Sequence, residues 1–161
     1  PRSTRKESSA ASDVYKRQLP SRPRVITASD DDLVKIWSAK YGNVEGTLEG
    51  HSAEVRSVAV SADGRRIITG SEDKTVKIWD GHVHEELMTL RGHTSSLLHV
   101  FLSLDGTSLL SCAEDNTVKV WRFIGRDHKK ADFMGQLTGA ARREQLIKIF
   151  LLQLHQRAWV S

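Results

Sequence analysis

Short runs of apolar and β-branched residues alternate with polar turn residues through the middle of this chain. In the most complete stretch, four such runs are predicted to form strands: residues 55–60, 66–70, 75–79 and 86–90. Each run has the length of an ordinary strand, and Asp63-Gly64 between the first two is a dipeptide suited to a tight hairpin. The pattern therefore predicts an antiparallel sheet of four strands joined by short turns.

This pattern repeats along the chain with a period of 42 residues. Three near-identical runs, ASDDDLVKIW, GSEDKTVKIW and CAEDNTVKVW, end at Trp37, Trp79 and Trp121, and Gly50-His51 recurs as Gly92-His93. The preceding unit contains only the last three strands, whereas the following unit contains the first three and ends at its tryptophan. The chain is therefore built from repeats.

A period of about 40 to 45 residues, with Gly-His early and Trp-Asp late, is typical of a four-stranded propeller blade. On these residues the chain resembles the WD40-repeat family, and Gly50-His51 with Trp79-Asp80 is its best-formed pair. The resemblance implies an all-β fold, a partial WD-repeat β-propeller of about two and a half repeats. Because propellers have about 4 to 8 blades, we expect the chain to be a fragment of a longer protein.

The segments on either side of the repeats depart from the pattern. Residues 1–24 are rich in Ser, Arg and Pro without apolar periodicity, so they are predicted to be a disordered or foreign lead before a propeller fragment at 25–122. Shifting the fourth strand forward by 42 residues gives residues 129–132, Lys-Lys-Ala-Asp, which fit a half-buried strand poorly. Residues 123–161 are therefore predicted to be a tail rather than a further strand and repeat.

The tail is predicted to contain an amphipathic helix at about residues 140–158. Apolar residues recur there at helical spacing: Ile147, Phe150, Leu151, Leu154 and Ala158. Such a helix is expected to dock on its own protein, or the stretch is incorrectly translated sequence. A helix that binds a membrane or a partner is the alternative.

Charge is unevenly distributed along the chain. A formal net charge of +4 suggests an acidic partner such as nucleic acid, but residues 25–121 carry nine basic and fifteen acidic side chains. Nucleic-acid binding would therefore depend on the basic ends, 1–24 and 122–161, and we rank it last. No apolar stretch approaches the roughly 18 residues of a membrane span, and the start has no signal-peptide core, so no membrane partner is expected.

Cys112 is the only cysteine and cannot form an internal disulfide. This suits a reducing compartment, so an intracellular protein, cytoplasmic or nuclear, is expected. Because Cys112 falls inside a predicted strand, we expect it to act as a small buried hydrophobe.

A histidine, a hydroxyl and an aspartate occur together twice at fixed spacing, which invites comparison with a catalytic triad. An active site needs one exposed nucleophile and an oxyanion hole, whereas two copies one repeat apart, each with a tryptophan, have the periodicity of architecture. In the WD40-repeat family these residue types form a hydrogen-bonded tetrad in each blade. Carried over by position, the tetrads comprise His51, Thr69, Asp73 and Trp79; His93, Ser111, Asp115 and Trp121; and, without a histidine, Thr27, Asp31 and Trp37.

No catalytic residue and no cofactor are therefore expected, and the chain is not predicted to be an enzyme. His82 and His84 lack the third ligand that a zinc site requires, so no metal site is expected either.

Partners of this family commonly bind the face around the narrow end of the channel. They contact residues at the start of the first strand of each blade and in the turn between the second and third strands. The corresponding positions are Asp30, Glu54, Arg56, Glu72, Ser96, Leu98 and Glu114. The three turn positions among them are acidic, which favours a basic peptide or protein segment and disfavours phosphates. Ordinary solvated turns are the alternative interpretation.

The predicted function is a non-catalytic scaffold that binds proteins or peptides, with no small-molecule ligand expected. The alternative is that the propeller is the targeting or sensing arm of a larger enzyme or signalling ATPase, whose catalytic domain lies outside this chain.

Overall fold

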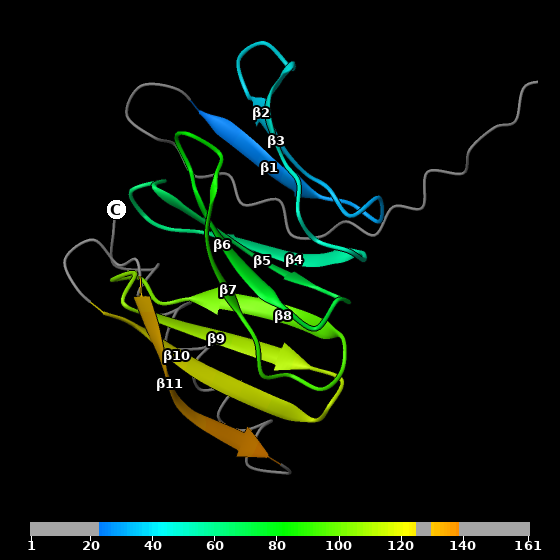
Figure 1. Ribbon diagram of the computed structural model, residues 1–161. Helices are drawn as coiled ribbons and strands as arrows, with labels where there is room; N and C mark the ends of the chain where they lie inside the picture. The colour runs from blue at the N-terminus through cyan, green and yellow to red at the C-terminus, as the bar shows by residue number, and fades with distance from the viewer. Residues whose placement is uncertain (1–22, 125–129, 139–161) are drawn as a thin grey trace, which may run out of the picture.

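The computed structural model describes residues 23–124 and 130–138, which form three antiparallel sheets (Figure 1). The first sheet contains β1 (Arg24–Ala28), β2 (Val34–Ser38) and β3 (Val44–Leu48). The second contains β4 (Val55–Val60), β5 (Arg66–Ser71), β6 (Val76–Asp80) and β7 (Glu86–Leu90). The third contains β8 (Leu97–Leu102), β9 (Ser108–Ala113), β10 (Thr117–Ile124) and β11 (Lys130–Thr138).

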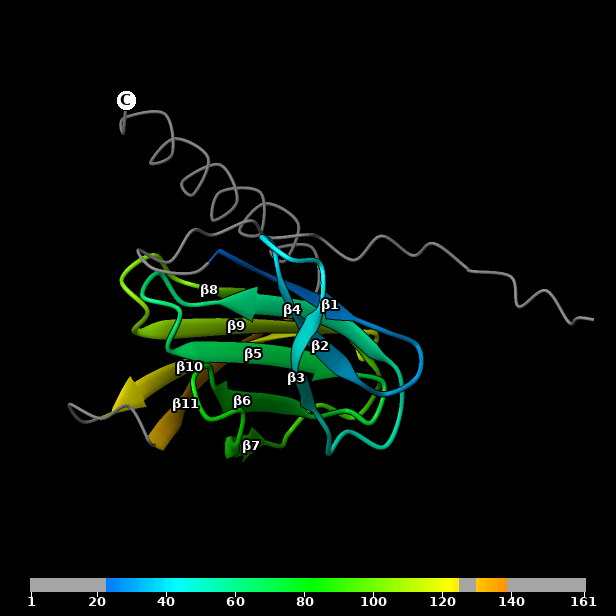
Figure 2. The same cartoon turned by 90° about the horizontal axis from the view of Figure 1, so that it is seen from above.

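In every sheet, strands that follow one another in sequence lie side by side, as in the blades of a propeller (Figure 2). This confirms the predicted all-β fold and its partial WD-repeat blades. The described residues contain no helix, so none that could cross a bilayer. The predicted lead at 1–24 lies almost entirely outside the described residues, as does the helix predicted at 140–158.

The same turn residues recur at the repeat spacing. Asp32, Lys74 and Asn116 adopt left-handed φ angles of 66°, 69° and 60° in the turn after the second strand position of each blade. Gly64 and Gly106 both have φ 68° in the hairpin that precedes it. Glycine tolerates this conformation without strain, which explains why the Asp-Gly dipeptide was a good indicator of a tight turn.

The third sheet corrects the prediction that the blade pattern ends after Trp121. β10 continues to Ile124 and β11 pairs with it antiparallel, so the blade has its fourth strand. In the second sheet Trp79 lies opposite Glu86, whereas in the third Trp121 lies opposite Phe133, five residues later than the repeat spacing gives. The 42-residue spacing therefore points to a residue five positions before the true partner of Trp121.

The five additional residues lengthen this hairpin, but its antiparallel pairing and the place of its register shift stay the same. Both sheets have a register shift at the same place, between Ile78 and Trp79 and between Val120 and Trp121. Beyond it, the third sheet gains three further pairs of strand residues, Arg122 with Asp132, Phe123 with Ala131 and Ile124 with Lys130. β11 is an edge strand, so backbone pairing and limited side-chain cover suffice to hold it.

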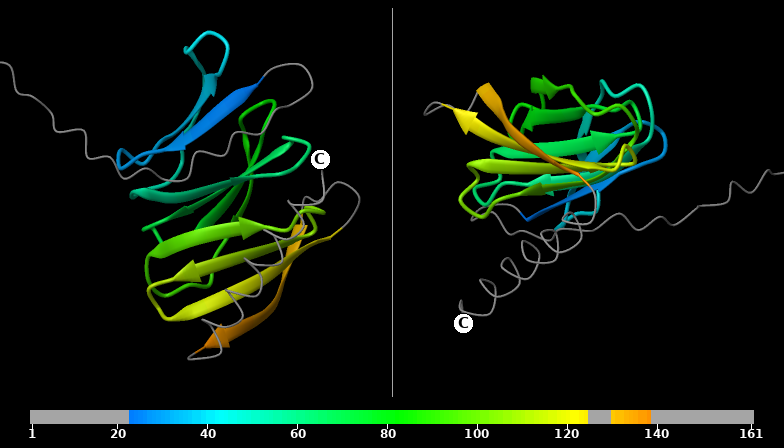
Figure 3. Two further views of the ribbon diagram at one scale, coloured as in Figure 1. Left: turned by 180° about the vertical axis from the view of Figure 1, so that it is seen from behind. Right: turned by 90° about the horizontal axis from the view of Figure 1, so that it is seen from below.

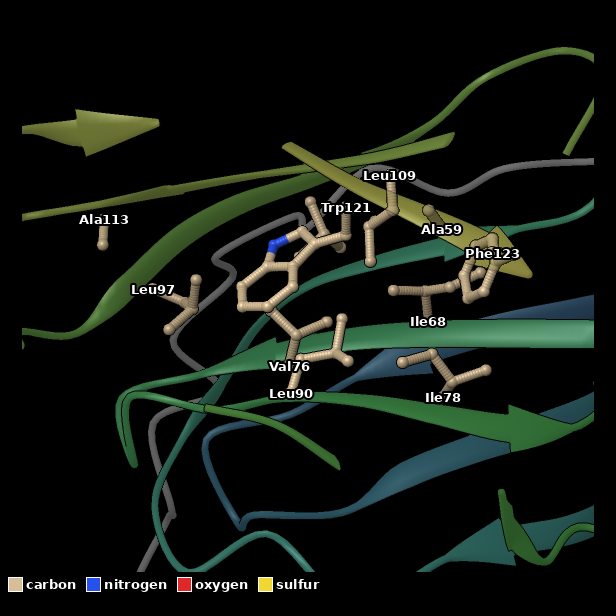
Figure 4. Close-up of a cluster of buried hydrophobic side chains, with 11 residues drawn as sticks. Ala59, Ile68, Val76, Ile78, Leu90, Leu97, Leu109, Ala113, Trp121 and Phe123 are labelled. Carbon is tan, nitrogen blue, oxygen red and sulfur yellow. The ribbon is translucent and has the colours of Figure 1, made fainter. Parts of the chain in front are cut away.

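Two apolar layers join the three sheets, because side chains of successive strand residues point to opposite faces. Between the first and second sheets the buried residues are Ile26, Val34, Ile36, Leu48, Val55, Val58, Ile67 and Trp79. Between the second and third sheets the layer includes Ile68, Val76, Ile78, Leu90, Leu97, Val100, Leu109, Trp121 and Phe123 (Figure 4). β5 is covered on both faces, which is why all six of its residues are buried.

Two arginines at equivalent repeat positions cross these layers. Arg24 pairs with Glu45 at 2.8 Å and donates to the backbone oxygen of Gly81 at 3.0 Å, which links the first sheet to the second. Arg66 donates to the backbone oxygen of Gly106 at 2.9 Å, and its guanidinium carbon lies 4.6 Å from the ring centre of Phe123. These contacts fix the position of each sheet against the next.

Candidate functional site

The second sheet brings all four residues of its predicted tetrad together. His51, in the loop before β4, lies with Nδ1 2.7 Å from Asp73 Oδ2 and with Nε2 2.7 Å from Thr69 Oγ1. Trp79 on β6 donates its indole N–H to the same Thr69 oxygen at 2.9 Å. Because that hydroxyl accepts from Trp79, its own hydrogen is available to Nε2, and Nδ1–H then donates to Asp73. The chain of bonds fits a neutral imidazole protonated on Nδ1.

The third sheet reproduces this arrangement on different residues. His93 Nδ1 lies 2.9 Å from Asp115 Oδ2, and His93 Nε2 lies 2.8 Å from Ser111 Oγ. Trp121 donates to Ser111 Oγ at 2.9 Å. Serine thus replaces threonine with its hydroxyl in the same place, which shows that the network needs the oxygen and not the methyl group.

The first sheet assembles only two of its three predicted residues. Trp37 donates to Thr27 Oγ1 at 2.8 Å, as in the other sheets. The prediction that Asp31 belongs to this network is wrong. Its carboxylate instead accepts a hydrogen bond from the backbone N–H of Leu33 and lies 3.6 Å from the Lys35 ammonium group. With no histidine to donate to it, this carboxylate turns toward solvent.

Each tetrad carboxylate also holds the backbone around it. Asp73 accepts from the N–H of Ser52 at 3.2 Å, from the N–H of Thr75 at 2.9 Å and from the Thr75 hydroxyl at 2.6 Å. Asp115 has the same three contacts, with Thr94 and Thr117. Thr75 and Thr117 are therefore further members of the two networks, and they were not among the predicted residues. The 42-residue spacing between them could have identified them.

Burial and hydrogen bonding shift the ionisation of both networks. Burial lowers the pKa of His51 and of His93 below the usual 6.5, although their aspartates act in the opposite direction. Burial alone would raise the pKa of Asp73, but hydrogen bonds from Thr75 and His51 outweigh it and leave that pKa below 3.8. The pKa of Asp115 is lowered for the same reasons. Near neutral pH the network is therefore a neutral histidine beside an ionised aspartate.

We expect the free energy of unfolding to fall as the pH drops below about 6.5. The unfolded chain binds protons at His51 and His93 before the folded chain does, so acid favours unfolding. Below pH 3.8 the two aspartates add to this loss, since their folded-state pKa values are also lowered. Denaturant melts from pH 7.5 to 5 test this expectation. His51→Gln and His93→Gln together should flatten the profile; an equally steep profile in the double variant would contradict it.

The tetrad hydroxyls are not placed to act as nucleophiles. Thr69 and Ser111 have no exposed surface, so neither hydroxyl can reach a substrate. Within residues 23–124 and 130–138 no group of three His, Cys, Asp or Glu side chains could hold a metal ion. His82 is exposed and His84 is half-buried, and Cys112 is buried in β9.

The predicted partner-binding residues lie at the end of the sheets that carries the tetrad aspartates. Backbone bonds join Glu72 to Glu54 at 2.9 Å and Glu114 to Ser96 at 3.0 Å, so these positions are neighbours within their sheets. Arg56 pairs with both Glu54, at 3.0 Å, and Glu72, and the hydrogen bond with Glu72 raises its pKa.

Charge at this end therefore differs between the sheets. Asp30 and Glu114 are exposed, whereas the Glu72 carboxylate is engaged by Arg56. Ser96 and Leu98 are half-buried. The third sheet carries the uncharged Leu98 in place of Arg56. Within the described part of the chain, the Glu114 carboxylate accepts a 3.4 Å hydrogen bond from Ser95 and has no basic partner.

Comparison with known proteins gives matches to the repeat region. The family model described as "WD domain, G-beta repeat" matches residues 42–80 and 84–122. The Denticleless protein homologs of Gallus gallus and Homo sapiens are 37% identical over 43 residues, which is 27% of this chain and 6% of each of those proteins. TOPLESS-RELATED PROTEIN 2 of Oryza sativa subsp. japonica is 50% identical over 34 residues, 21% of this chain and 3% of that protein. The chain thus matches only a small part of the length of these relatives.

Proposed function

Because residues 42–80 and 84–122 are WD40 repeats, we propose that this chain is part of a non-catalytic scaffold that binds basic peptides or protein segments. The proposed binding surface is the sheet end that carries Asp30, Glu54, Glu72 and Glu114. WD40 repeats are typical of protein-interaction scaffolds.

The observation that carries the proposal is the way in which the tetrads hold this end. Asp73 and Asp115 each bind a histidine and two backbone N–H groups, which immobilises the turn next to Glu72 or Glu114. A surface that is already ordered loses little conformational entropy when a partner binds. Acidic side chains on such turns attract a basic segment over roughly 10 Å at 0.1 M salt.

Charge reversal of Glu114 is expected to weaken binding of an Arg/Lys-rich peptide by about tenfold at 50 mM salt. The effect should shrink toward twofold or less at 500 mM salt, because salt screens exposed charges. Glu72→Lys should weaken binding less per residue, since Arg56 already neutralises part of that charge. Binding can be measured by fluorescence anisotropy with a labelled basic peptide.

Glu85→Lys provides the matched control, because Glu85 is exposed at the opposite end of β6. It makes the same change of net charge away from the proposed surface. Equal weakening by Glu85→Lys and Glu114→Lys would show that only net charge matters. Absence of salt-dependent binding by the unmodified chain would refute the choice of a basic partner.

A further inference from the structure

The turn between β6 and β7, drawn in green, lies beside the start of β1, drawn in blue (Figure 3). His84 in this turn has a left-handed φ of 62°, and its backbone N–H donates to the backbone oxygen of Asp80 at 3.0 Å. Its imidazole ring rests on Gly46 of β3, where a Cβ atom would overlap ring atoms Nδ1 and Cε1. The absence of a side chain at Gly46 therefore gives the ring its place between the first and second sheets.

The ring is not anchored by a hydrogen bond at its buried nitrogen. Nε2 of His84 is shielded from water and has no hydrogen-bond partner within residues 23–124 and 130–138. The carboxylates that act on this ring are already engaged. Glu45 pairs with Arg24 at 2.8 Å, and Asp80 accepts two backbone hydrogen bonds within its own turn, at 2.7 and 3.0 Å. Shape alone therefore holds the ring on β3.

The charged and titratable groups around the ring come from each element packed against it: Arg24 of β1, Glu45 of β3, Asp80 of β6 and His82 of the turn. The two basic groups oppose a positive charge on the ring, whereas the two carboxylates favour one. Burial outweighs the carboxylates and lowers the pKa of His84 below its usual 6.5. Protonation would also make Nε2 a charged donor that is shielded from water and has no acceptor. The contact with Gly46 therefore suits the neutral ring.

We propose that His84 is a pH-sensitive contact, which holds the first sheet against the second while its ring is neutral and loosens that sheet when the ring is protonated. The same turn supplies the backbone oxygen of Gly81 to Arg24 at 3.0 Å, so a charged ring would place a second cation at this junction. His84 follows the end of β6 that lies away from Asp73. The contact is therefore separate from the proposed peptide site, and the two can be tested independently.

Amide hydrogen exchange of the full chain, measured by NMR at pH 7.5 and pH 5.5, reports on this contact. The opened state binds the proton with an ordinary pKa near 6.5, whereas the closed state binds it less readily, so acid favours opening. Protection factors in β1 and β3, corrected for the intrinsic pH dependence of exchange, should fall by up to about tenfold through this histidine.

His84→Asn removes the titrating ring and keeps a residue that tolerates the left-handed φ. In this variant the fall in protection of β1 and β3 should be several-fold smaller, whereas any fall in β8 to β10 should be unchanged. His82→Asn is the matched control, because His82 is exposed in the same turn, and it should keep the full fall. An equal fall in His84→Asn and in the unmodified chain, or no fall in the unmodified chain, would overturn the proposal.

Gly46→Ala gives a second readout at constant pH. A change from glycine to alanine inside a strand is otherwise stabilising, but here the methyl group would push the ring of His84 off β3. Protection of β1 and β3 should therefore fall several-fold already at pH 7.5. Adding His84→Asn should restore part of it, because the shorter side chain leaves room for the methyl group. Unchanged protection in Gly46→Ala, or no recovery in the double variant, would also contradict the proposal.

Discussion

Replacement of Trp79 by alanine is expected to lower the free energy of unfolding by about 3 to 5 kcal/mol. Trp79 is 2% exposed and belongs to the layer between the first and second sheets. Its ring also meets the His51 ring edge-on, with 6.1 Å between centres, and its N–H donates to Thr69. The variant therefore removes a large apolar contact and one donor of the tetrad together. Urea unfolding followed by circular dichroism measures the loss.

Two further variants separate these contributions. Trp79→Phe keeps most of the apolar contact and loses only the indole donor, so it should cost about 1 kcal/mol. Trp37→Ala removes the equivalent tryptophan of the first sheet, which is half-buried and is not part of the layer against the second sheet. A loss from Trp37→Ala as large as that from Trp79→Ala would mean that the layer between the sheets is not the source of the effect.

Asp73→Ala is expected to lower the free energy of unfolding by about 1 to 3 kcal/mol. The change leaves the buried His51 without its acceptor and releases the N–H groups of Ser52 and Thr75. It should also accelerate hydrogen exchange at these two amides, since they lose the carboxylate that orders them. Thermal melts and amide exchange measured by NMR give the two readouts.

Asp31→Ala is the natural control for this prediction. Asp31 has the same position in its repeat, but it is exposed and makes no histidine contact among the described residues. Its loss should cost less than about 0.5 kcal/mol, as is usual for surface substitutions. An unchanged melting temperature for Asp73→Ala would show that the tetrad does not stabilise the blade.

The strands of the second sheet could be predicted from the sequence because their signals are local. The predicted runs 55–60 and 86–90 coincide with β4 and β7, and the other two agree with β5 and β6 to within one residue. Alternating apolar residues and Asp-Gly turns determine these elements without reference to the rest of the chain. The repeat spacing gives the position of a fourth strand only where the hairpin between the third and fourth strands has the same length in both blades. The β10–β11 hairpin is longer than the β6–β7 hairpin, so the spacing fails there.

The remaining features depend on contacts between distant residues. β11 was missed because five additional residues displace Phe133 from the position that the repeat gives. The contact of Arg66 with Gly106 joins two sheets across 40 residues. Arg24 and Arg66 keep the repeat spacing, but they bind carbonyl groups at different repeat positions, so the spacing does not predict the partner. Asp31 has the expected residue type at the expected position, but Leu33 stands where the other repeats have a threonine hydroxyl. Residue identity at a position therefore predicts a network only when its partners are also present.

The longer hairpin of the third sheet has a consequence for protein engineering. Five residues have been accommodated between Trp121 and Phe133 with the register shift, the strand order and the tetrad all preserved. We therefore expect the hairpin formed by β10 and β11 to accept a grafted epitope or reporter peptide without loss of the fold. The turn between β5 and β6 offers no such tolerance, because its aspartate holds the backbone on both sides.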